Sequence, residues 1–174
     1  MEEHKIPERP IDFSYQVDDH VWAGEYPRNL DDLTSQEKIE QFRKFGITHF
    51  IDLTEEGELK PYAQMLWDGA SHRRFPVEDG GIPESTDSVR QLISEIQDII
   101  DGNPEAKIYI HCWGGVGRTG QIVASYIAIT RKFDYDNTMF LLHLYFSRNP
   151  KSGWRDVPEN RQQCEFIRGI CEGK

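Results

Sequence analysis

Four short apolar runs, each bounded by polar or glycine-containing segments, mark the predicted strands of this chain. Such runs between turn signals are typical of strands that lie in a buried sheet. They cover His20–Gly24, Ile47–Leu53, Arg73–Val77 and Lys107–His111. The segments between them follow a different, longer period.

These longer segments repeat their apolar residues at spacings of three and four, which is the period of one helix face. Thr34 and Glu37 form a capping box that opens the first helix, and Gly46 ends it. Ser85 caps a second helix that runs to Gly102. The remaining predicted helices are a short one near Tyr62–Trp67 and longer ones at Thr119–Lys132, Asn137–Ser147 and Pro158–Cys171.

Strands and helices alternate along the chain, which indicates an α/β fold. We expect a central, mostly parallel sheet of about four to five strands, flanked by helices. The helix over Thr119–Lys132 is apolar nearly all round, so it is expected at the centre of the molecule. The loop between the last central strand and this buried helix then becomes the candidate binding site.

Length and charge narrow the function classes. The 174 residues show no repeat or linker, so we expect one domain over residues 1–174, with residues 1–12 as a polar arm held in part by Ile11 and Phe13. The formal charge of −10 argues against nucleic acid or an anionic membrane as partner. The chain shows neither a run long enough to span a membrane nor the apolar region of a secretory signal.

The cysteines are few and odd in number. Cys112, Cys164 and Cys171 make no disulfide framework, so a cytoplasmic location is expected. Cys164 and Cys171 lie seven residues apart on one face of a predicted helix, where we expect them to be buried and without function.

The most informative stretch is HCWGGVGRTG, residues 111–120, in which a glycine-rich loop joins a strand to a helix. In such a loop the backbone N–H groups point inward, and the helix N-terminus favours an anion. A Walker A loop would need glycine at position 112 and lysine at 118, where this chain has Cys112 and Arg118. The predicted phosphate-binding residues are Trp113, Gly114, Gly115, Val116, Gly117 and Arg118.

Cys112 is the predicted nucleophile. The loop N–H groups, Arg118 and the helix dipole all stabilise a thiolate, and a thiolate beneath a phosphoryl group can attack it in line. A Cys–His hydrolase fits less well, because His111 is the neighbouring strand residue and its side chain should point away from the thiol. A structural zinc site would need paired cysteines, which the chain lacks. We therefore expect no metal and no cofactor.

These residues resemble the H-C-x5-R-[ST] signature of the cysteine-dependent protein tyrosine phosphatases. The size and layout are similar to the compact dual-specificity-type branch of that superfamily. Nothing in the chain resembles the K-N-R-Y recognition motif of the larger tyrosine phosphatases. The resemblance implies hydrolysis of a phosphate monoester through a phosphocysteine intermediate.

A general acid must protonate the leaving group, and FPVEDGGIPES is suited to carry it. This stretch resembles the acid loop P-x-x-D-x-x-x-P of the same family, which assigns the acid to Asp79. The rival is the neighbouring Glu78, which misses the spacing of that motif. Without the thiol loop, Asp79 would be an ordinary turn aspartate before two glycines.

The resemblance also implies roles in the second step. Asp79 would then act as a base toward water, and the hydroxyl of Thr119 would assist the sulfur as leaving group. VPENRQQCEF is similar to the segment P-E-T-x-x-Q-x-x-F of the family, with Asn160 in place of threonine. Gln163 would position the hydrolytic water, with Gln162 as the alternative, although Pro-Glu is also a plain helix start.

The predicted function is that of a protein phosphatase acting on phosphotyrosine and, in addition, on phosphoserine or phosphothreonine. A phosphorylated protein is the expected partner, and phosphate, sulfate or vanadate is the expected ligand of the loop. One alternative is a phosphatase for phosphoinositides, inositol phosphates or RNA 5′-phosphate, and another is an inactive phosphate-binding adaptor. The basic stretch Arg148, Lys151, Arg155 and Arg161 is expected to form a solvated face, with attraction of an anionic substrate as the alternative.

Overall fold

The computed structural model describes residues 8–174, so the first seven residues of the predicted polar arm lie outside the described part. One five-stranded sheet has the order β1-β2-β5-β3-β4. Every neighbouring pair is parallel except β1 and β2, which are antiparallel. The strands are β1 Ser14–Gln16, β2 Val21–Gly24, β3 His49–Asp52, β4 Ser71–Arg74 and β5 Ile108–His111.

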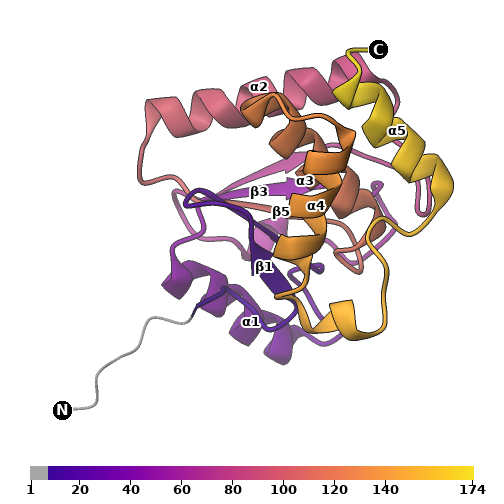
Figure 1. Ribbon diagram of the computed structural model, residues 1–174. Helices are drawn as coiled ribbons and strands as arrows, with labels where there is room; N and C mark the ends of the chain where they lie inside the picture. Colours follow the sequence, from indigo (N-terminus) through magenta and orange to yellow (C-terminus); the bar gives the residue numbers. More distant parts are fainter. Residues whose placement is uncertain (1–7) are drawn as a thin grey trace.

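Helices cover both faces of this sheet (Figure 1). One helix, α1 (Asp32–Phe45), packs on one face, and four pack on the other. These four are α2 Thr86–Gly102, α3 Gly117–Arg131, α4 Tyr135–Phe146 and α5 Arg161–Cys171. Two short 3₁₀ helices, η1 (Ala63–Met65) and η2 (Pro150–Gly153), lie in the connections. The fold class predicted from the sequence is therefore confirmed.

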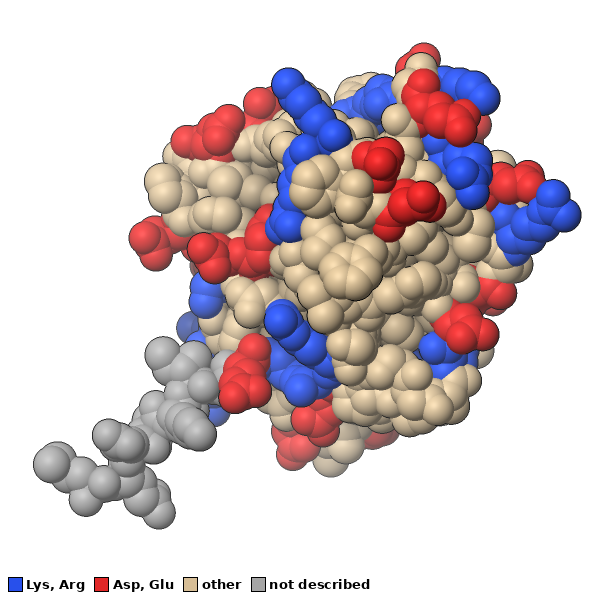
Figure 2. Space-filling view, viewed as in Figure 1, with Lys and Arg blue, Asp and Glu red and all other residues tan. Residues whose placement is uncertain are grey.

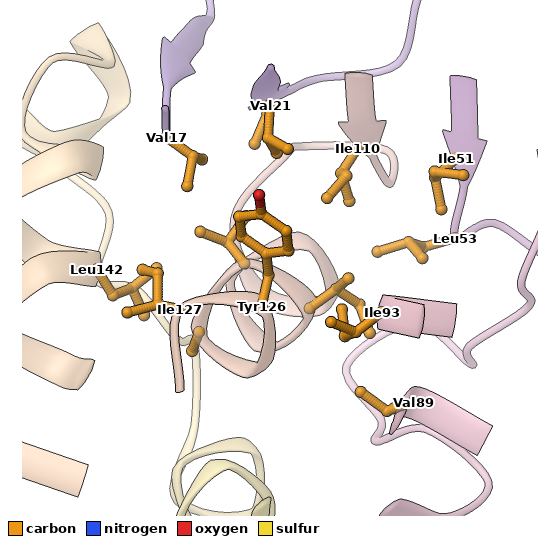
Figure 3. Packing of buried hydrophobic residues seen from close by; sticks show 14 of the residues in the cluster. Val17, Val21, Ile51, Leu53, Val89, Ile93, Ile110, Tyr126, Ile127 and Leu142 are labelled. Atoms are coloured by element: carbon orange, nitrogen blue, oxygen red, sulfur yellow. The ribbon is translucent and has the colours of Figure 1, made fainter. Parts of the chain in front are cut away.

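The larger core lies between the sheet and α3, and its apolar side chains converge from several elements (Figure 3). The ring of Tyr126 on α3 points toward Val21 and Ile110 of the sheet. All residues of α3 from Gly117 to Ala128 are buried, as the all-round apolar pattern predicted. The helix that follows the glycine-rich loop is thereby held rigidly at the centre of the molecule.

A second, aromatic core lies on the α1 face. Phe42 of α1 packs edge-on against Phe50 of β3 and Tyr109 of β5, with ring centroids 5.3 and 4.6 Å apart. Tyr62 is buried in the same cluster. The two cores fix β5 from both sides, and β5 carries the residues that lead into the loop.

The predicted strands are found, with two differences. β1 was not predicted, because three residues on a sheet edge carry too little apolar pattern to be recognised. The third predicted strand, Arg73–Val77, is displaced, since the regular strand is Ser71–Arg74. After β4 the chain continues beside β3 without forming a regular strand. Two backbone hydrogen bonds hold it there: the Phe75 N–H donates to Asp52 O and the Val77 N–H to Leu53 O.

Four of the five α-helices begin at residues other than those predicted. The cap of α1 is Asp31, whose carboxylate accepts from the Thr34 N–H, so Thr34 lies inside the helix. Helix α3 begins two residues earlier than predicted, at Gly117, and α4 begins at Tyr135 behind the Asp134 cap. Helix α5 begins at Arg161 rather than at Pro158. Ser85 caps α2 as predicted, and Gly102 is its last residue.

Cys164 and Cys171 are half-buried rather than fully buried, and both thiols are free. Within residues 8–174 no helix is long and apolar enough to cross a membrane. On the face in Figure 2, acidic and basic side chains surround a broad uncharged area over α4, so the described part of this face has no continuous basic patch. Phe140 and Leu144 of α4 are exposed.

Candidate active site

The glycine-rich loop connects β5 to α3 and places a thiol at its base. Cys112 follows β5 directly and is 3% exposed. Its Sγ accepts a hydrogen bond from the Gly115 N–H at 3.2 Å. The loop therefore turns back over the sulfur and directs the Gly115 N–H toward it.

One loop glycine is required by geometry. Gly115 has a φ of 73°, in the left-handed region, and a Cβ there would overlap the backbone of Gly24 at the end of β2. A side chain at Gly115 would therefore push the loop away from β2. A Cβ on Gly117 would meet only the end of the Glu159 side chain, which can move aside.

The N-terminus of α3 is free to bind an anion. Side chains cap the other four α-helices, but the N-cap residue of α3 is Val116, whose side chain makes no capping hydrogen bond. Its first N–H groups are therefore left for another acceptor, and the helix dipole favours a negative one. The Val116 side chain itself is buried in the larger core, so any contact with an anion comes from its backbone.

The loop carbonyls are turned outward and bound. The Trp113 carbonyl accepts from the Tyr26 N–H at 2.9 Å, and the Gly114 carbonyl accepts from Lys151 Nζ at 2.7 Å. Lys151 Nζ also lies 3.1 Å from the Glu25 carboxylate. These bonds hold the negative ends of the loop peptides away from the space above the sulfur.

His111 supports the loop from below. Its Nδ1 lies 3.1 Å from the Cys112 carbonyl, which can only accept, so Nδ1 carries the proton. Nε2 then accepts from the Tyr62 hydroxyl at 2.6 Å. Burial lowers the pKa of His111 to about 4, so the ring is neutral at physiological pH. Its ring packs against Tyr26 and Tyr62 in the aromatic core, so it points away from the thiol as predicted.

Arg118, in the first turn of α3, is 2% exposed and held by Glu58. Its Nη1 donates to Oε2 of Glu58 at 2.9 Å and its Nη2 to Oε1 at 2.7 Å, while Nη1 also donates to the Val77 carbonyl at 3.0 Å. Burial alone would lower the pKa of Arg118, but the Glu58 hydrogen bonds raise it above its ordinary value. The hydrogen bonds from Arg118 in turn lower the pKa of Glu58.

Sequence reasoning missed Glu58. It lies in the charged loop TEEGELKP, in which three glutamates are equivalent by pattern. Only the tertiary structure brings one of them to Arg118, sixty positions later in the chain. No local signal distinguishes Glu58 from Glu55 or Glu56.

Asp79 reaches the same place from the acid loop, which we define as residues 76–83. Its Oδ1 lies 3.3 Å from Nη2 of Arg118, and its side chain is 66% exposed. Asp79 lines a cavity of about 990 Å³ together with Cys112, Gly117 and Arg118. Glu78, the rival for the acid, is exposed and does not line this cavity.

Thr119 and Gln163 are both fully buried. Within residues 8–174 the Thr119 hydroxyl has no hydrogen-bond partner, so it forms no bond to the Cys112 sulfur. Gln163 uses both ends of its amide: Nε2 donates to the Gly81 carbonyl at 3.2 Å, and Oε1 accepts from the Glu159 N–H at 2.9 Å. Gln162, the alternative, is exposed. The roles of Thr119 and Gln163 in hydrolysis stay predictions.

The rim of the cavity includes two basic residues that were expected on a solvated face. Trp113 is 59% exposed and lines the cavity, next to the apolar Leu59. Lys151 and Arg155 also line it, so half of the basic stretch faces the site instead of forming a solvated face. The turn of η2 brings Lys151 back onto the loop, and the interval between η2 and α5 carries Arg155. Arg161 pairs with Glu165 along α5 and is exposed.

The described residues contain no group of three or more His, Cys, Asp or Glu side chains that could hold a metal ion. The side chains of Cys112, Arg118 and Asp79, a thiol, a guanidinium and a carboxylate, line one cavity at the N-terminus of α3. This set of groups is typical of enzymes in which a sulfur attacks a bound phosphoryl group.

Comparisons with known proteins agree with that class. A protein-family model described as "Polymorphic toxin system, DSP-PTPase phosphatase" matches residues 27–132, which is more than half of the chain. The chain therefore belongs to this family of DSP-PTPase phosphatases, within the cysteine-dependent protein tyrosine phosphatase superfamily and of the dual-specificity type.

Sequence relatives carry the same description. A protein of Invertebrate iridescent virus 3 named "Putative tyrosine phosphatase 067L" is 32% identical over 161 residues, covering 88% of this chain and 63% of its own length. "Putative tyrosine phosphatase 197R" of Invertebrate iridescent virus 6 is 25% identical, covering 76% of this chain and 46% of its own length. The chain thus spans less than two thirds of these relatives.

Solved structures share the fold. The active form of Tk-PTP matches with a TM-score of 0.74 at 18% identity, covering 92% of this chain and 97% of that chain. PTPMT1 in complex with PI(5)P matches with a TM-score of 0.70 at 15% identity, covering 93% of this chain and 96% of that chain. At this level of identity the likeness concerns the fold alone.

Proposed function

We propose that this chain hydrolyses phosphate monoesters through a phosphocysteine intermediate, with residues 8–174 as one catalytic domain. One observation carries the proposal: Cys112, Arg118 and Asp79 line the same cavity, at the uncapped N-terminus of α3. A protein that only binds phosphate needs the helix end and the arginine, but it needs neither a nucleophile nor an acid.

In the first step the Cys112 thiolate attacks phosphorus. The S–P bond forms as the P–O bond to the leaving group breaks, and Asp79 donates its proton to the departing oxygen. Arg118 and the loop N–H groups hold the phosphoryl oxygens while charge moves among them. Arg118 is already oriented for this role by Glu58.

In the second step water attacks phosphorus, and Asp79 accepts its proton. The S–P bond breaks, the thiolate is regenerated and inorganic phosphate leaves. The Thr119 hydroxyl, buried and without a partner among the described residues, is available to stabilise the departing thiolate. Gln163 supports the acid loop in this structure and would act on the water only if its amide left Gly81.

Phosphotyrosine in a protein is the proposed substrate, with phosphoserine and phosphothreonine in addition. The viral relatives are named as tyrosine phosphatases. The loop positions between Cys112 and Arg118 carry no cation, and exposed Trp113 offers an aromatic wall to a phenyl ring. Three free thiols support a reducing, cytoplasmic location.

A second candidate is a phosphatase for polyanionic substrates such as inositol phosphates or phosphoinositides. The observation in its favour is that Lys151 and Arg155 line the cavity. Each of them is paired with a carboxylate, Lys151 with Glu25 and Arg155 with Glu159, but Glu25 also pairs with Lys38. We keep phosphotyrosine as the first proposal because the loop between Cys112 and Arg118 carries no cation.

The test is Cys112→Ser, with Cys164→Ser as the matched control that removes a thiol away from the cavity. The Cys112 variant should lose turnover of p-nitrophenyl phosphate without added metal and still bind phosphate, while the control keeps wild-type rates. Turnover by Cys112→Ser near the wild-type rate would refute the covalent mechanism. Phosphate binding without any turnover by the wild-type chain would support the adaptor instead.

A further inference from the structure

The acid loop is anchored through its backbone carbonyls on both sides of Asp79. Before Asp79, the Val77 carbonyl accepts from Nη1 of Arg118 at 3.0 Å. After it, the Gly80 carbonyl accepts from Nδ2 of Asn160 at 2.9 Å. The residue that supplies the acid thus lies between two anchored peptide groups.

A further pair of amides holds the next peptide. The Gly81 carbonyl accepts from Nε2 of Gln121 at 3.0 Å and from Nε2 of Gln163 at 3.2 Å. Gln121 lies on α3, three residues after Arg118, so the helix that presents the arginine also binds the acid loop. Gln163 and Asn160 bind the loop from α5 and its N-terminal cap.

These anchors matter because little else fixes Asp79. Its side chain is largely exposed, and two glycines follow it, the first with a φ of 74°. A loop with this sequence has wide backbone freedom unless its peptides are bound. The Asn160 bond is the anchor nearest to Asp79 on the flexible side.

Asn160 does two separable things. Its Oδ1 accepts from the Gln163 N–H at 3.0 Å, which caps α5, and its Nδ2 donates to Gly80. Serine, threonine and aspartate can also cap a helix, but only an amide combines that acceptor with an N–H donor. In the motif that this segment resembles, threonine takes the place of Asn160, so the second bond is a property of this chain's own residue.

We propose that Asn160 is a positioning residue, which holds Asp79 over the cavity by binding the Gly80 carbonyl. The inference rests on the proposed function and goes beyond it, because Asn160 touches neither the sulfur nor the phosphate. It acts through Asp79, and of the two steps that use Asp79 only the proton donation depends on the leaving group. Its removal therefore matters in proportion to how much the leaving group needs that proton.

The experiment uses Asn160→Ser and Asn160→Thr, which keep a capping oxygen and remove the amide N–H that binds Gly80. Phenyl phosphate has a poor leaving group, whereas 2,4-dinitrophenyl phosphate has one that hardly needs a proton. We expect kcat/KM, which reports the steps up to departure of the leaving group, to fall roughly fivefold for phenyl phosphate, as for the loss of one hydrogen bond, and to stay within about twofold for the dinitrophenyl ester. Asn103→Ser, at the far end of α2, is the control and should change neither rate. Equal losses on both esters would overturn the proposal.

A double-mutant cycle separates positioning from a general structural effect. If Asn160 acts through Asp79, then Asn160→Ser should change nothing further in an Asp79→Ala background. The same loss in both backgrounds would contradict the proposal.

Amide hydrogen exchange gives a readout that does not depend on turnover. The peptide over residues 78–84 should exchange about fivefold faster in Asn160→Ser than in wild type, while peptides from α5 stay unchanged. Unchanged exchange in the acid loop would overturn the proposal even in an inactive protein. Faster exchange together with a wild-type chain that lacks Cys112-dependent turnover would uphold the loop anchor and refute the proposed function.

Discussion

Glu58 and Arg118 form a two-pronged ion pair, with Nη–Oε distances of 2.9 and 2.7 Å, between a loop after β3 and the first turn of α3. Because both prongs of the carboxylate are used, the guanidinium plane is fixed. The two Nη atoms of Arg118 also reach the acid loop, where Nη1 donates to the Val77 carbonyl and Nη2 lies 3.3 Å from Oδ1 of Asp79. Through these contacts Arg118 joins α3 to the loop after β3 and to the acid loop, which are distant from one another in sequence.

Glu58→Gln should lower kcat/KM for p-nitrophenyl phosphate by about tenfold or more, because Arg118 loses its orientation. It should also destabilise the fold by about 1.5–3 kcal/mol, since a hydrogen-bonded charge is removed from a nearly buried partner. Steady-state kinetics and urea unfolding measure the two effects. Glu56→Gln, an exposed neighbour in the same loop, is the control, and a similar loss there would argue against the ion pair as the cause.

Asp79→Ala should reduce kcat on a phosphotyrosyl peptide by about a hundredfold, because the tyrosyl oxygen must leave with a proton. The loss on p-nitrophenyl phosphate should be much smaller. In a pH profile of kcat, the limb that reports the general acid should disappear. Should Glu78→Ala show this pattern and Asp79→Ala not, the acid assignment is displaced by one residue.

The sequence could predict the features that depend on residues close together in the chain. Cys112, the loop glycines and Arg118 lie within one continuous motif, and local geometry alone gives them their roles. The fold class could be predicted from the spacing of apolar residues, which is also a local pattern. Asp79 came from a second local motif, and the structure places it 3.3 Å from Arg118.

The parts that could not be predicted depend on contacts between distant segments. Glu58 is one of several equivalent acids until the chain folds. The bonds of Asn160 and Gln121 to the acid loop join positions about 80 and 40 residues apart, and no local pattern encodes them. The start of α1 differs from the prediction for a local reason. Thr34 has the side chain of a typical cap, but Asp31, three residues earlier, supplies the capping oxygen.

The buried ring of His111 should make stability depend on pH. Its pKa is about 4 in the folded chain, against an ordinary value of 6.5, because burial disfavours the charged ring more than the neighbouring Asp52 favours it. Above pH 6.5 both states are neutral and the stability is complete. As the pH falls toward 4 only the unfolded chain binds the proton, so up to about 3 kcal/mol of stability is lost.

Urea unfolding at pH 7 and pH 5 measures this loss. In His111→Gln the difference between the two pH values should shrink, although the variant is less stable at both. His143→Gln removes an exposed histidine of α4 and should leave the difference as in wild type. A pH dependence of His111→Gln equal to that of wild type would place the titrating group elsewhere.

The substrate preference is decided by the charge of the cavity. An added phosphate on a substrate brings more than one negative charge at neutral pH, so an enzyme for inositol polyphosphates needs unpaired cations near its loop. Here Lys151 and Arg155 face the cavity and each is bound to a carboxylate, which Lys151 shares with Lys38. The loop between Cys112 and Arg118 has no cation, and the rim carries Trp113. We therefore expect kcat/KM on phosphotyrosyl peptides to exceed that on any phosphoinositide or soluble inositol phosphate by at least about tenfold, which requires only ~1.4 kcal/mol of differential transition-state binding.

Arg155→Gln should leave the peptide rate within about twofold, because this cation is not needed for a single phosphate. Rates measured at matched salt on phosphopeptides, inositol phosphates and lipid vesicles check the order. A reversed preference in wild type, lost in Arg155→Gln, would mean that the rim cations bind substrate and that the polyanion candidate is the correct one.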